Sequence, residues 1–402
     1  MSFLPAEQQL QALSRHARVA PEEEFREKLA LGRPLRVKLG LDPTAGDVHL
    51  GWTVVLRRLR AFQDLGHTAV LILGDFTARI GDPSGQNKTR PMLSASEVRE
   101  FAGVLVGQVR RILSDERLEV RYNSEWLEKL GVGGVLALTS HQTVARMLER
   151  DDFSQRYAAQ SPITITEFLY PLLQGYDSVA VQADVEMGGN DQTFNLLVGR
   201  HIQPAYAQPP QVILTMPLLE GTDGVGKMSQ SKGNYIGIEE PPDEMFGKLM
   251  RVPDPLMIKY LELVTDLPGQ EVEQVSSGVA SGEVRPEAAK RRLAHSVVRM
   301  YHGAEAADAA LERFDTVFRH HAMPQDIPER PLPDDCVQDG EVFVPRLLRE
   351  VGFAESTAAG RRLIAQGGVR VDDKPLEAES VPADSLRGRV LQKGRRQFVR
   401  LV

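Results

Sequence analysis

Residues 38–56 read KLGLDPTAGDVHLGWTVVL, and this stretch decides the fold of the chain. It begins as an apolar strand pattern, passes through a polar loop and continues as a helix pattern. In the helix, Val55, Leu59 and Phe62 recur three and four residues apart. Gly66 follows as the expected C-cap. A strand, a loop and a helix in this order predict one unit of a parallel α/β sheet, with the loop at the carboxyl end of the strand.

The same alternation recurs along the chain as far as about residue 220. Short β-rich apolar runs lie around residues 70–76, 120 and 212–218, and longer helical patterns separate them. This order predicts a Rossmann-like, doubly wound parallel sheet. From about residue 240 to 320 the pattern is mostly helical, which predicts an α-helical domain after the sheet.

A proline-rich segment, MPQDIPERPLPDDC, separates these parts from the end of the chain. It has no long apolar periodicity, so we interpret it as a linker. After it, a short helix, a second helix N-capped by Ser356 and two strand patterns predict a small α+β domain. The predicted division is an α/β domain at 1–222, a loop and helical domain at 223–323, a linker at 324–340 and a small domain at 341–402.

The composition is that of a soluble globular protein. The chain has 402 residues, of which 42% are hydrophobic and 26% charged, and no apolar run approaches the length of a membrane span. Fibrous, disordered and transmembrane classes are therefore excluded. The first 25 residues show no secretion signal, and the single cysteine, Cys336, excludes an internal disulfide or a multi-cysteine zinc site. We expect a cytoplasmic protein of two or three domains with no membrane partner.

Charge is unevenly distributed along the chain. The net charge of −7 argues against a general nucleic-acid binder. Residues 341–402, however, contain twelve Lys and Arg against eight Asp and Glu, and residues 387–400 carry six positive charges and no negative one. A polyanion could dock on this tail without being attracted to the rest of the surface.

Two segments have the composition of a phosphate site. His49 and Gly51 lie at a helix start, which offers free N–H groups and a positive dipole end to a phosphate. The second segment, EGTDGVGKMSQSKGNYI (residues 220–236), follows a strand and could fold over a polyphosphate, although it lacks the spacing of a P-loop. Taken alone, each is better explained as an ordinary loop, the first with a histidine beside a helix and the second as a solvated glycine-rich turn.

Together, the two segments resemble the signature pair of class I aminoacyl-tRNA synthetases, the HIGH motif and the KMSKS loop. The resemblance extends over essentially the whole chain to bacterial tyrosyl-tRNA synthetases, in the subgroup with a KMSKS-type rather than a KFGKT-type loop. The segments that carry it are GLDPTAGDVHLG (40–51), GDFTARIGDPSG (74–85), YNSEW (122–126), EFLYPLLQGYDS (167–178), VEMGGNDQTFN (185–195) and GKMSQSKGNYIG (226–237).

This resemblance implies that the chain activates L-tyrosine with ATP to tyrosyl-adenylate and pyrophosphate, and then transfers the tyrosyl group to the 3′ end of tRNA(Tyr). It implies no covalent enzyme intermediate, so the residues would position substrates and stabilise charge. Mg²⁺ would accompany ATP as its counter-ion, with no protein metal site and no prosthetic group. The implied catalytic residues are Thr44, His49, Lys227 and Ser229, and the implied ATP contacts are Asp42, Gly51, Trp52, Gly189, Gln230 and Lys232.

Part of the tyrosine pocket follows from helical spacing. Tyr170, Gln174 and Asp177 lie on one face of an otherwise apolar helix, a pattern that by itself fits a satisfied core network equally well. The resemblance implies that Tyr170 and Gln174 contact the α-amino group. It also implies that Asp177 accepts the phenol hydroxyl and so rejects phenylalanine, a rule for which tyrosyl enzymes are the standard example. Enzymes with the KFGKT-type loop have a tyrosine as second phenol partner, where this chain has Lys38. The remaining implied contacts are Thr77, Asp82, Asn123 and Gln192.

The C-terminal segment resembles the small αL RNA-binding fold of the S-four type. In the related synthetases this domain binds the anticodon arm and the long variable arm of tRNA(Tyr), helped by the helical domain before it. Without the resemblance, a solvated basic face would be the favoured interpretation. The residues implied to contact RNA are Arg361, Arg362, Lys393, Arg395 and Arg396.

Three positions depart from the family pattern. Trp52 replaces the second histidine of HIGH, Gln230 replaces the second lysine of KMSKS, and Gln86 stands at a position that is basic in the family. Loss of the charge at residue 230 would remove about 1–3 kcal/mol of transition-state stabilisation if uncompensated. The cations that could compensate are Lys88, Arg90 and Lys232.

Two other functions stay open at this point. A synthetase-derived RNA-binding protein with weak or lost aminoacylation would explain Trp52, Gln230 and the basic tail, although it would not need a complete amino-acid pocket. A tryptophan–tRNA ligase is the nearest alternative enzyme, but the acid opposite the ring oxygen and the basic C-terminal domain favour tyrosine. A homodimer is implied by the resemblance alone, because periodicity singles out no interface helix.

Overall fold

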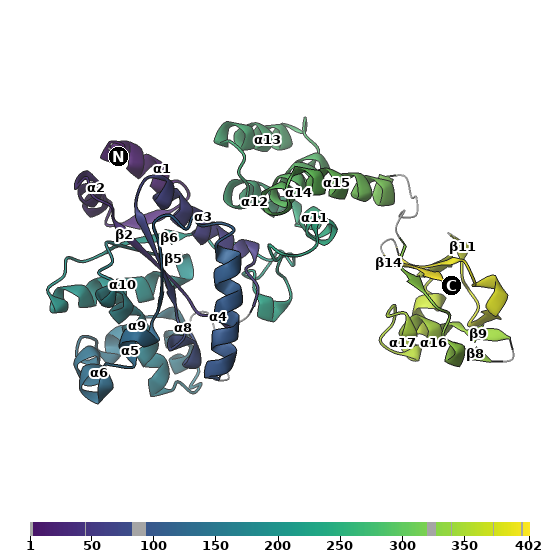
Figure 1. Cartoon of the computed structure of the whole chain (residues 1–402), viewed down its shortest axis with the longest axis horizontal. Helices are drawn as coiled ribbons and strands as arrows, with labels where there is room; N and C mark the ends of the chain where they lie inside the picture. Colours follow the sequence, from purple (N-terminus) through teal and green to yellow (C-terminus); the bar gives the residue numbers. More distant parts are fainter. Residues whose placement is uncertain are drawn as a thin grey trace. The chain divides into compact units, whose positions relative to one another are not determined.

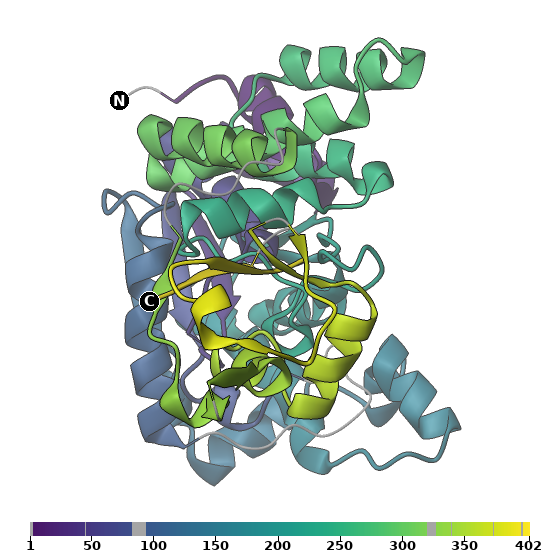
Figure 2. The same cartoon turned by 90° about the vertical axis from the view of Figure 1, so that its right-hand side faces the viewer.

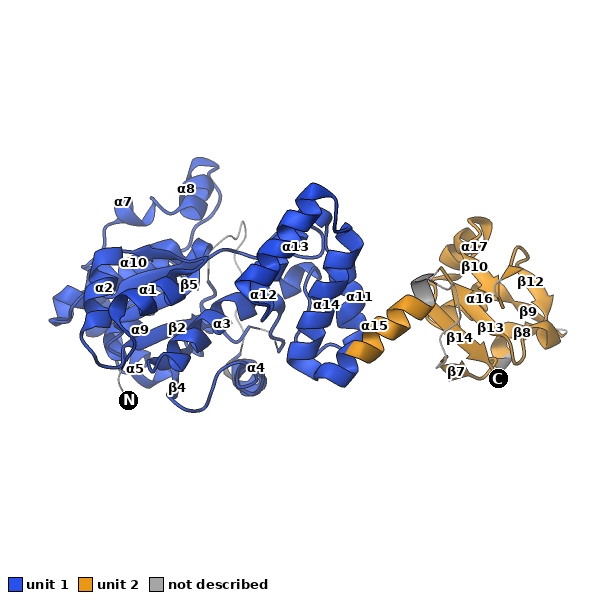
Figure 3. Cartoon of the chain, turned by 90° about the horizontal axis from the view of Figure 1, so that it is seen from above, with its two compact units in different colours: residues 1–307 blue, residues 308–402 orange. Residues whose placement is uncertain are grey.

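The computed structural model describes residues 3–44, 46–82, 94–319, 327–338, 340–372, 374–394 and 397–402. The chain forms two compact units, Met1–Ala307 and Asp308–Val402 (Figure 3). The first unit combines a β-sheet with many helices, and the second is a small α+β structure (Figure 1). The predicted fold class is therefore confirmed: a doubly wound α/β sheet, a helical part and a small α+β domain.

Within the described residues, the sheet of the first unit has six strands in the order β1-β6-β5-β2-β3-β4. β1 is antiparallel to β6, and the other pairs are parallel. The chain winds from β2 outward through β3 to β4, and from β5 in the opposite direction to β6. The winding reverses between β2 and β5, and such a reversal is where doubly wound sheets bind ligands. The strands are β1 (Arg18–Ala20), β2 (Arg36–Leu41), β3 (Thr68–Leu73), β4 (Leu118–Tyr122), β5 (Val185–Gly189) and β6 (Val212–Met216).

Strand β5 lies inside the sheet, yet the apolar runs of the sequence do not predict it. It reads VEMGG, with a fully buried Glu186 and two glycines at its end. A charged residue and glycines break the apolar pattern by which buried strands are recognised. The structure accommodates the charge because Glu186 pairs with Lys38 of β2, a contact between residues far apart in the sequence.

Helix α3 (Leu50–Asp64) connects β2 to β3 and packs on β2, β3 and β5. Gly66 follows its C-terminal end with a φ of 93°, so the predicted glycine cap is confirmed. Helices α9 (Ile165–Ala180) and α10 (Thr193–Ile202) pack against each other. Glycines permit their close approach, since a Cβ on Gly175 would lie 3.2 Å from the backbone of Gly199. In Figure 1, α4 (Ala95–Val109) stands on the opposite side of the strands from α10.

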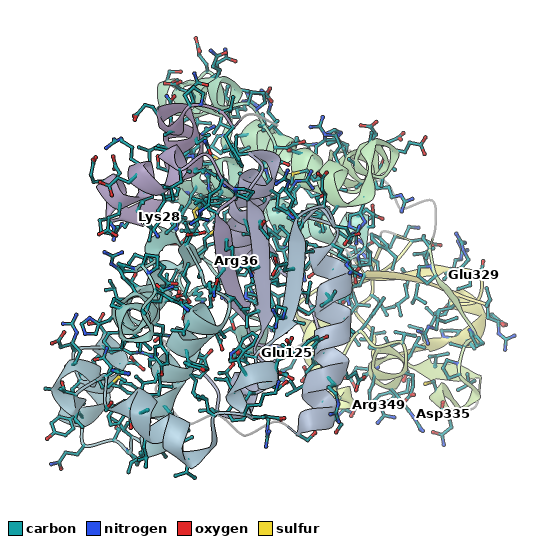
Figure 4. All side chains as sticks on the ribbon, turned by 60° about the vertical axis from the view of Figure 1, so that its left-hand side comes forward. Lys28, Arg36, Glu125, Glu329, Asp335 and Arg349 are labelled. Carbon is teal, nitrogen blue, oxygen red and sulfur yellow. The ribbon has the colours of Figure 1, made fainter. Side chains whose placement is uncertain are left out.

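Ion pairs hold the amino ends of the strands. Arg36 at the start of β2, labelled in Figure 4, donates to Glu119 of β4 at 2.7 Å. Asp184, just before β5, accepts from Arg33 at 2.7 Å. The charged groups at this end are therefore bound to one another, in keeping with a ligand site at the carboxyl ends.

The remaining helices of the first unit lie before β2, between β4 and α9, and after β6. The stretch 286–314, which has a helical pattern, forms two helices because Gly303, with a φ of 89°, ends the first. No helix in the described part of the chain is long and apolar enough to cross a membrane. These helices are α1 (Ala6–Ser14), α2 (Glu22–Ala30), α5 (Ser124–Leu127), α6 (Gly131–Thr139), α7 (Val144–Met147), α8 (Asp151–Ala158), α11 (Pro242–Met250), α12 (Met257–Val264), α13 (Gly269–Ser281), α14 (Pro286–His302) and α15 (Ala304–Arg319), the last of which continues into the second unit.

In the second unit, two helices lie beside two small sheets (Figure 2). Ser356 accepts from the Ala359 N–H at 3.2 Å, as expected of the predicted N-cap. Residues 327–338, inside the segment interpreted as a linker, form two strands and place Cys336 in the core, so the second unit begins before residue 341. The elements are β7 (Glu329–Arg330), β8 (Val337–Gln338), β9 (Glu341–Phe343), α16 (Val344–Glu350), α17 (Thr357–Ala365), β10 (Val369–Val371), β11 (Lys374–Pro375), β12 (Ser380–Pro382), β13 (Val390–Lys393) and β14 (Gln397–Leu401).

Candidate active site

The predicted site residues of the first unit gather where β2 and β5 end. The loop after β2 leads through Asp42 and Thr44 to the start of α3, and β5 ends at Gly189 in the short turn η2 (Asn190–Gln192). Helix α9 brings a third group of predicted residues to the same region, because Tyr170 bonds to Asp42. The reversal of the sheet therefore brings together segments that are distant in sequence.

His49 forms the N-cap of α3 and is 3% exposed. Burial lowers its pKa to about 4, and the charge of Lys227 acts in the same direction, so the imidazole is neutral near pH 7. Its Nδ1 atom is buried and has no hydrogen-bond partner among the described residues. A neutral ring nitrogen left without a partner at a helix start is suited to a phosphate oxygen.

The KMSQS loop, residues 227–231, meets the start of α3. Met228 is buried, and its Sδ accepts from the Gly51 N–H at 3.3 Å. A Cβ on Gly51 would lie 3.0 Å from the His49 ring. The absence of a side chain at Gly51 therefore allows the ring to lie close to the backbone of α3. The ring of Trp52 lies 5.4 Å from that of His49. Trp52 therefore supplies an aromatic surface beside His49 in place of the second histidine of the motif.

Lys227 reaches from this loop to the turn after β5. Its Nζ pairs with Asp191 at 2.5 Å. Gly189 lies against this ion pair, since a Cβ on Gly189 would be 2.5 Å from the Asp191 carboxylate. The loop lysine is therefore neutralised by a carboxylate of the chain itself.

Side-chain hydrogen bonds fix the shape of the KMSQS loop. Asn234 accepts from the Ser229 N–H at 2.8 Å and donates to Asp223 at 2.9 Å. The Ser229 hydroxyl lies 2.9 Å from that of Ser231. Gln230, which replaces the usual lysine, donates to the carbonyl of Asp47 in the loop before α3. The amide at residue 230 thus joins the two motif segments without supplying a charge.

Asp42 connects the loop after β2 to the predicted tyrosine contacts. Its carboxylate accepts from the Tyr170 hydroxyl at 2.8 Å and from the Thr77 hydroxyl at 2.8 Å. Burial raises the pKa of Asp42 to about 7, and these two bonds act against that rise. The structure therefore places Asp42, predicted as an ATP contact, against two residues predicted to bind tyrosine.

Asp177 is buried on α9 and faces two donors. It accepts from the Trp126 indole N–H at 2.8 Å and from the Asn123 amide at 3.3 Å. Burial raises the pKa of Asp177 to about 6, while the positive charge of Lys38 opposes the rise. At pH 7 the carboxylate is thus mostly ionised and can accept a further hydrogen bond.

A chain of amide side chains links the other predicted tyrosine contacts. Asn195 donates to Gln174 at 3.0 Å and to Gln192 at 2.9 Å. Gln192 donates in turn to Asp82 at 2.9 Å, and Arg150 lies 3.6 Å from the Asp82 carboxylate. The predicted residues Gln174, Gln192 and Asp82 therefore belong to one network, held together by Asn195.

Lys38 does not take the place of a second phenol partner. Its Nζ is fully buried and donates to the backbone carbonyl of Gln174 at 2.7 Å, the Ser178 hydroxyl at 2.8 Å and the Glu186 carboxylate at 2.8 Å. An ammonium has three N–H donors, and all of them are used. Lys38 instead forms a buried ion pair under the tyrosine contacts.

Sequence reasoning missed the residues that hold the site residues in place. Each lies inside a segment that carries the family resemblance, or beside one, but spacing alone does not show which side chain it will meet. The missed residues are Trp126, Glu186, Asp191, Asn195 and Met228.

The predicted RNA contacts lie in the second unit. Arg362 and Lys393 line one hollow of about 600 Å³. Arg361 is paired with Glu379 at 2.9 Å, and its guanidinium lies 5.5 Å from the centre of the Phe343 ring. The predicted residues outside the described part of the chain are Gln86, Lys88, Arg90, Arg395 and Arg396. Among the predicted ATP contacts, Lys232 directly follows the KMSQS loop and is exposed. No group of three His, Cys, Asp or Glu in the described ranges could hold a metal ion.

The doubly wound sheet, the buried histidine at a helix start and the lysine-bearing loop beside it are the arrangement that the resemblance to class I aminoacyl-tRNA synthetases implies, and the comparisons with known proteins test the family itself. The family model described as tRNA synthetases class I (W and Y) matches residues 30–319. A tyrosine–tRNA ligase of Moorella thermoacetica is 51% identical over 389 residues, covering 96% of this chain and 93% of that protein. One of Thermotoga maritima is 48% identical, covering 98% and 97%. The chain belongs to this class I family, and within it to the tyrosine–tRNA ligases.

Solved structures share the fold at lower identity. A C-terminally truncated mitochondrial tyrosyl-tRNA synthetase of Aspergillus nidulans has a TM-score of 0.63 and 20% identity, covering 78% of this chain and 99% of that one. The tyrosyl-tRNA synthetase of Archaeoglobus fulgidus, complexed with L-tyrosine, has a TM-score of 0.62 and 23% identity, covering 76% and 99%. The comparisons do not support the two alternatives, a synthetase-derived RNA-binding protein and a tryptophan–tRNA ligase.

Proposed function

We propose how this tyrosine–tRNA ligase divides its reactions among its residues. One observation carries the proposal: the buried carboxylate of Asp177 accepts from Trp126 at 2.8 Å and from Asn123 at 3.3 Å. An ionised carboxylate offers about four acceptor positions. Two donors leave room for the O–H of the substrate phenol, which phenylalanine lacks. Asp177 is thus the specificity residue for tyrosine.

The α-amino group of tyrosine binds among Tyr170, Gln174 and Asp82. Tyr170 donates its hydroxyl proton to Asp42, so its oxygen is left as an acceptor toward the substrate. Asp82 is an acceptor because it is a carboxylate. An ammonium group needs three acceptors, and these three side chains supply them. Thr77, Asn123 and Gln192 hold this arrangement through their bonds to Asp42, Asp177 and Asp82.

In the first reaction a carboxylate oxygen of tyrosine attacks the α-phosphorus of ATP. A new C–O–P linkage forms, the bond between the α-phosphorus and the bridging oxygen breaks, and pyrophosphate leaves with the electron pair. His49, neutral and with a free ring nitrogen, and Thr44 donate to the α-phosphate as its charge grows. The nucleotide lies against Gly51, Trp52 and Gly189 in this proposal.

Lys227 and Ser229 stabilise the leaving pyrophosphate. Lys227 is paired with Asp191, so it must exchange this carboxylate for phosphate oxygens when ATP binds. Lys232, exposed nearby, compensates for the neutral Gln230. Mg²⁺ enters with ATP as the counter-ion of its phosphates.

In the second reaction the tyrosyl group passes to the 3′ end of tRNA(Tyr). We assign substrate activation to residues 1–222, support of the tRNA to the helices of residues 223–323, and binding of its outer arms to the second unit. Arg362 and Lys393, which line one hollow, support this assignment as a pair of cations directed at one site. We also assign the enzyme to the cytoplasm, where ATP and uncharged tRNA are available.

A second copy of the chain packs on α6 in this proposal. Helix α6 reads GVGGVLALT and leaves Val132 79% and Leu136 65% exposed. Helix α9 packs against α6, and Ile165 at its start is 80% exposed. An apolar helix with this much exposed surface is typical of an interface between subunits. Replacing Leu136 by Glu should convert a dimer into a monomer in sedimentation experiments, whereas the exposed Leu31→Glu should not. A wild-type monomer would contradict the proposal.

The activation reaction is tested by pyrophosphate exchange. The purified chain should exchange labelled pyrophosphate into ATP when tyrosine is present, and should do so far less with phenylalanine or tryptophan. No tyrosine-dependent exchange at saturating ATP would contradict the proposal. A tryptophan-dependent exchange of equal rate would contradict the role of Asp177.

A further inference from the structure

The buried pair of Lys38 and Glu186 contacts Gln174, one of the residues assigned to the α-amino group. Both side chains are fully buried and their charged atoms are 2.8 Å apart. Glu186 also accepts from the Gln174 amide at 3.1 Å, the Ser178 hydroxyl at 3.0 Å, and Gln211. The carboxylate is therefore surrounded by donors from several elements.

Glu186 dictates which way the Gln174 side chain faces. An ionised carboxylate only accepts hydrogen bonds, so the amide of Gln174 must turn its NH₂ group toward Glu186. Its carbonyl oxygen then faces the opposite direction, where it accepts from Asn195 at 3.0 Å. In the proposed function, this oxygen is the one that receives the substrate ammonium group.

The amide chain beyond Gln174 has orientations that agree with this one. Asn195 donates its NH₂ group to both Gln174 and Gln192, because its own oxygen accepts from Arg150 at 3.1 Å. Gln192 turns its NH₂ group to Asp82, which it meets at 2.9 Å. Glu186 therefore fixes the Gln174 end of the chain, while Arg150 and Asp82 fix the rest.

Lys38 is what keeps Glu186 an acceptor. Burying a lone carboxylate is costly, and the ion pair with Lys38 offsets that cost. A side chain at residue 186 that could donate as well as accept would no longer restrict the Gln174 amide to one orientation. The three bonds of Lys38, one of them to the backbone carbonyl of Gln174 itself, also fix this turn of α9 against β2.

We propose that Lys38 and Glu186 form a positioning pair that orients the Gln174 amide, so that its oxygen serves as one of the acceptors for the α-amino group of the substrate. Neither residue touches the substrate. The inference rests on the proposed contact between Gln174 and the α-amino group.

Two ligands separate this role from general support of the fold. Tyramine has the phenol and the ammonium group but no carboxylate, and 3-(4-hydroxyphenyl)propionate has the phenol and the carboxylate but no ammonium group. Dissociation constants for both are measured by calorimetry on the full chain. The double variant Lys38→Met/Glu186→Gln leaves no unpaired buried charge, but its residue 186 can both donate and accept.

The double variant should bind tyramine about tenfold more weakly, as expected when a charged group loses an aligned acceptor. Its affinity for 3-(4-hydroxyphenyl)propionate should stay within about twofold. The matched control is Arg156→Met/Glu167→Gln, which neutralises another buried pair, formed between α8 and α9, that has no bond to Gln174. This control should leave the ratio of the two affinities unchanged. Equal weakening of both ligands in the double variant, or an unchanged ratio, would overturn the proposal.

Glu186→Asp covers the case in which the double variant does not fold. It keeps the charge pair but withdraws the carboxylate from the Gln174 amide, and tyramine should bind about threefold more weakly. Tyramine binding equal to wild type would overturn the positioning role. Gln174→Met tests the underlying assignment: if it binds tyramine as tightly as wild type does, the contact between Gln174 and the α-amino group is wrong, independently of the pair.

Discussion

Replacing Asp177 by Asn tests the origin of tyrosine specificity. The substitution keeps the size of the side chain but exchanges one acceptor oxygen for an NH₂ group. In the structure the two carboxylate oxygens meet separate donors, Trp126 and Asn123. Asn123 cannot reverse its amide to adapt, because its own oxygen accepts from the Phe76 N–H at 3.0 Å. One donor must therefore face another donor in the variant.

The magnitude follows from these contacts. A buried donor that loses its acceptor costs about 1–3 kcal/mol, so the free energy of unfolding should fall by about that amount. Tyrosine loses a charge-assisted bond and retains at best a neutral one, which should lower kcat/KM for tyrosine by about 10–30-fold. The kcat/KM for phenylalanine should rise, because phenylalanine no longer leaves a buried carboxylate unpaired. A preference of the order of 10⁴–10⁵ for tyrosine, the value for which tyrosyl enzymes are the standard example, should fall by at least about 10²-fold.

The assay is pyrophosphate exchange with tyrosine and with phenylalanine over a range of pH. Burial raises the pKa of Asp177 to about 6, so wild-type kcat/KM for tyrosine should rise as the pH increases through about 6. The variant should lack this rise, because asparagine does not ionise. The pH dependence of stability has the opposite sign to that of activity. Because the pKa of Asp177 is higher in the folded chain than its ordinary value of 3.8, its protonation stabilises the folded state, fully so below pH 3.8. This stabilisation is lost as the pH rises through about 6.

Asp184→Asn is the matched control. Asp184 is also a buried carboxylate, but it precedes β5 and bonds to Arg33 and the Arg36 N–H. The control should lose stability without losing specificity. If Asp177→Asn keeps the preference for tyrosine within threefold of wild type, the acceptor role of Asp177 is wrong.

Three further substitutions test other parts of the site. Lys227→Ala should slow adenylate formation by about 10²–10³-fold and leave the Kd of tyrosine within twofold, since the loop acts on the leaving group; equal losses in pre-steady-state rate and tyrosine affinity would speak against this. Gly51→Ala adds a Cβ 3.0 Å from the His49 ring, and such overpacking costs about 1–3 kcal/mol. The KM for ATP should therefore rise about tenfold, while the unfolding free energy changes little because alanine gains about 1 kcal/mol over glycine in a helix. Unchanged ATP binding would place the nucleotide elsewhere. Arg362→Ala/Lys393→Ala should reduce the slope of log affinity for tRNA(Tyr) against log salt by about 1.4–1.8 without affecting adenylation; an unchanged slope would remove these residues from the interface.

The parts of the fold with local signals could be predicted from the sequence. The glycine after α3 and the serine before α17 are recognised from a few neighbouring residues, and both are confirmed. Strand β5 could not be predicted, because Glu186 breaks its apolar pattern and finds its partner Lys38 only in the folded chain. The early start of the second unit was hidden for a related reason. Prolines suggested a linker, whereas two short strands and a buried cysteine pack into the domain.

The site shows the same division. Helical spacing predicts Tyr170, Gln174 and Asp177 on one face of a helix, and all three lie on α9. The motifs predict His49 and Lys227 in one site, and Lys227 is close enough for its charge to act on the His49 ring. The roles of these residues stay predictions. The partners of these residues are non-local, such as Asp191 for Lys227 and Trp126 for Asp177. Nothing in the spacing of a sequence encodes such pairs, since they depend on how the ends of β2 and β5 and the start of α9 meet.

The chain contains only two tryptophans, and in the proposed function one lies beside each substrate. Trp52 lies beside His49 at the start of α3, and Trp126 donates its indole N–H to Asp177. The protein thus has two native fluorophores at separate positions in the proposed site. Emission of a Trp52→Phe variant would report the arrival of the phenol, and emission of a Trp126→Phe variant the arrival of the nucleotide. The order in which the two substrates bind could be timed in a stopped-flow instrument without attaching any label.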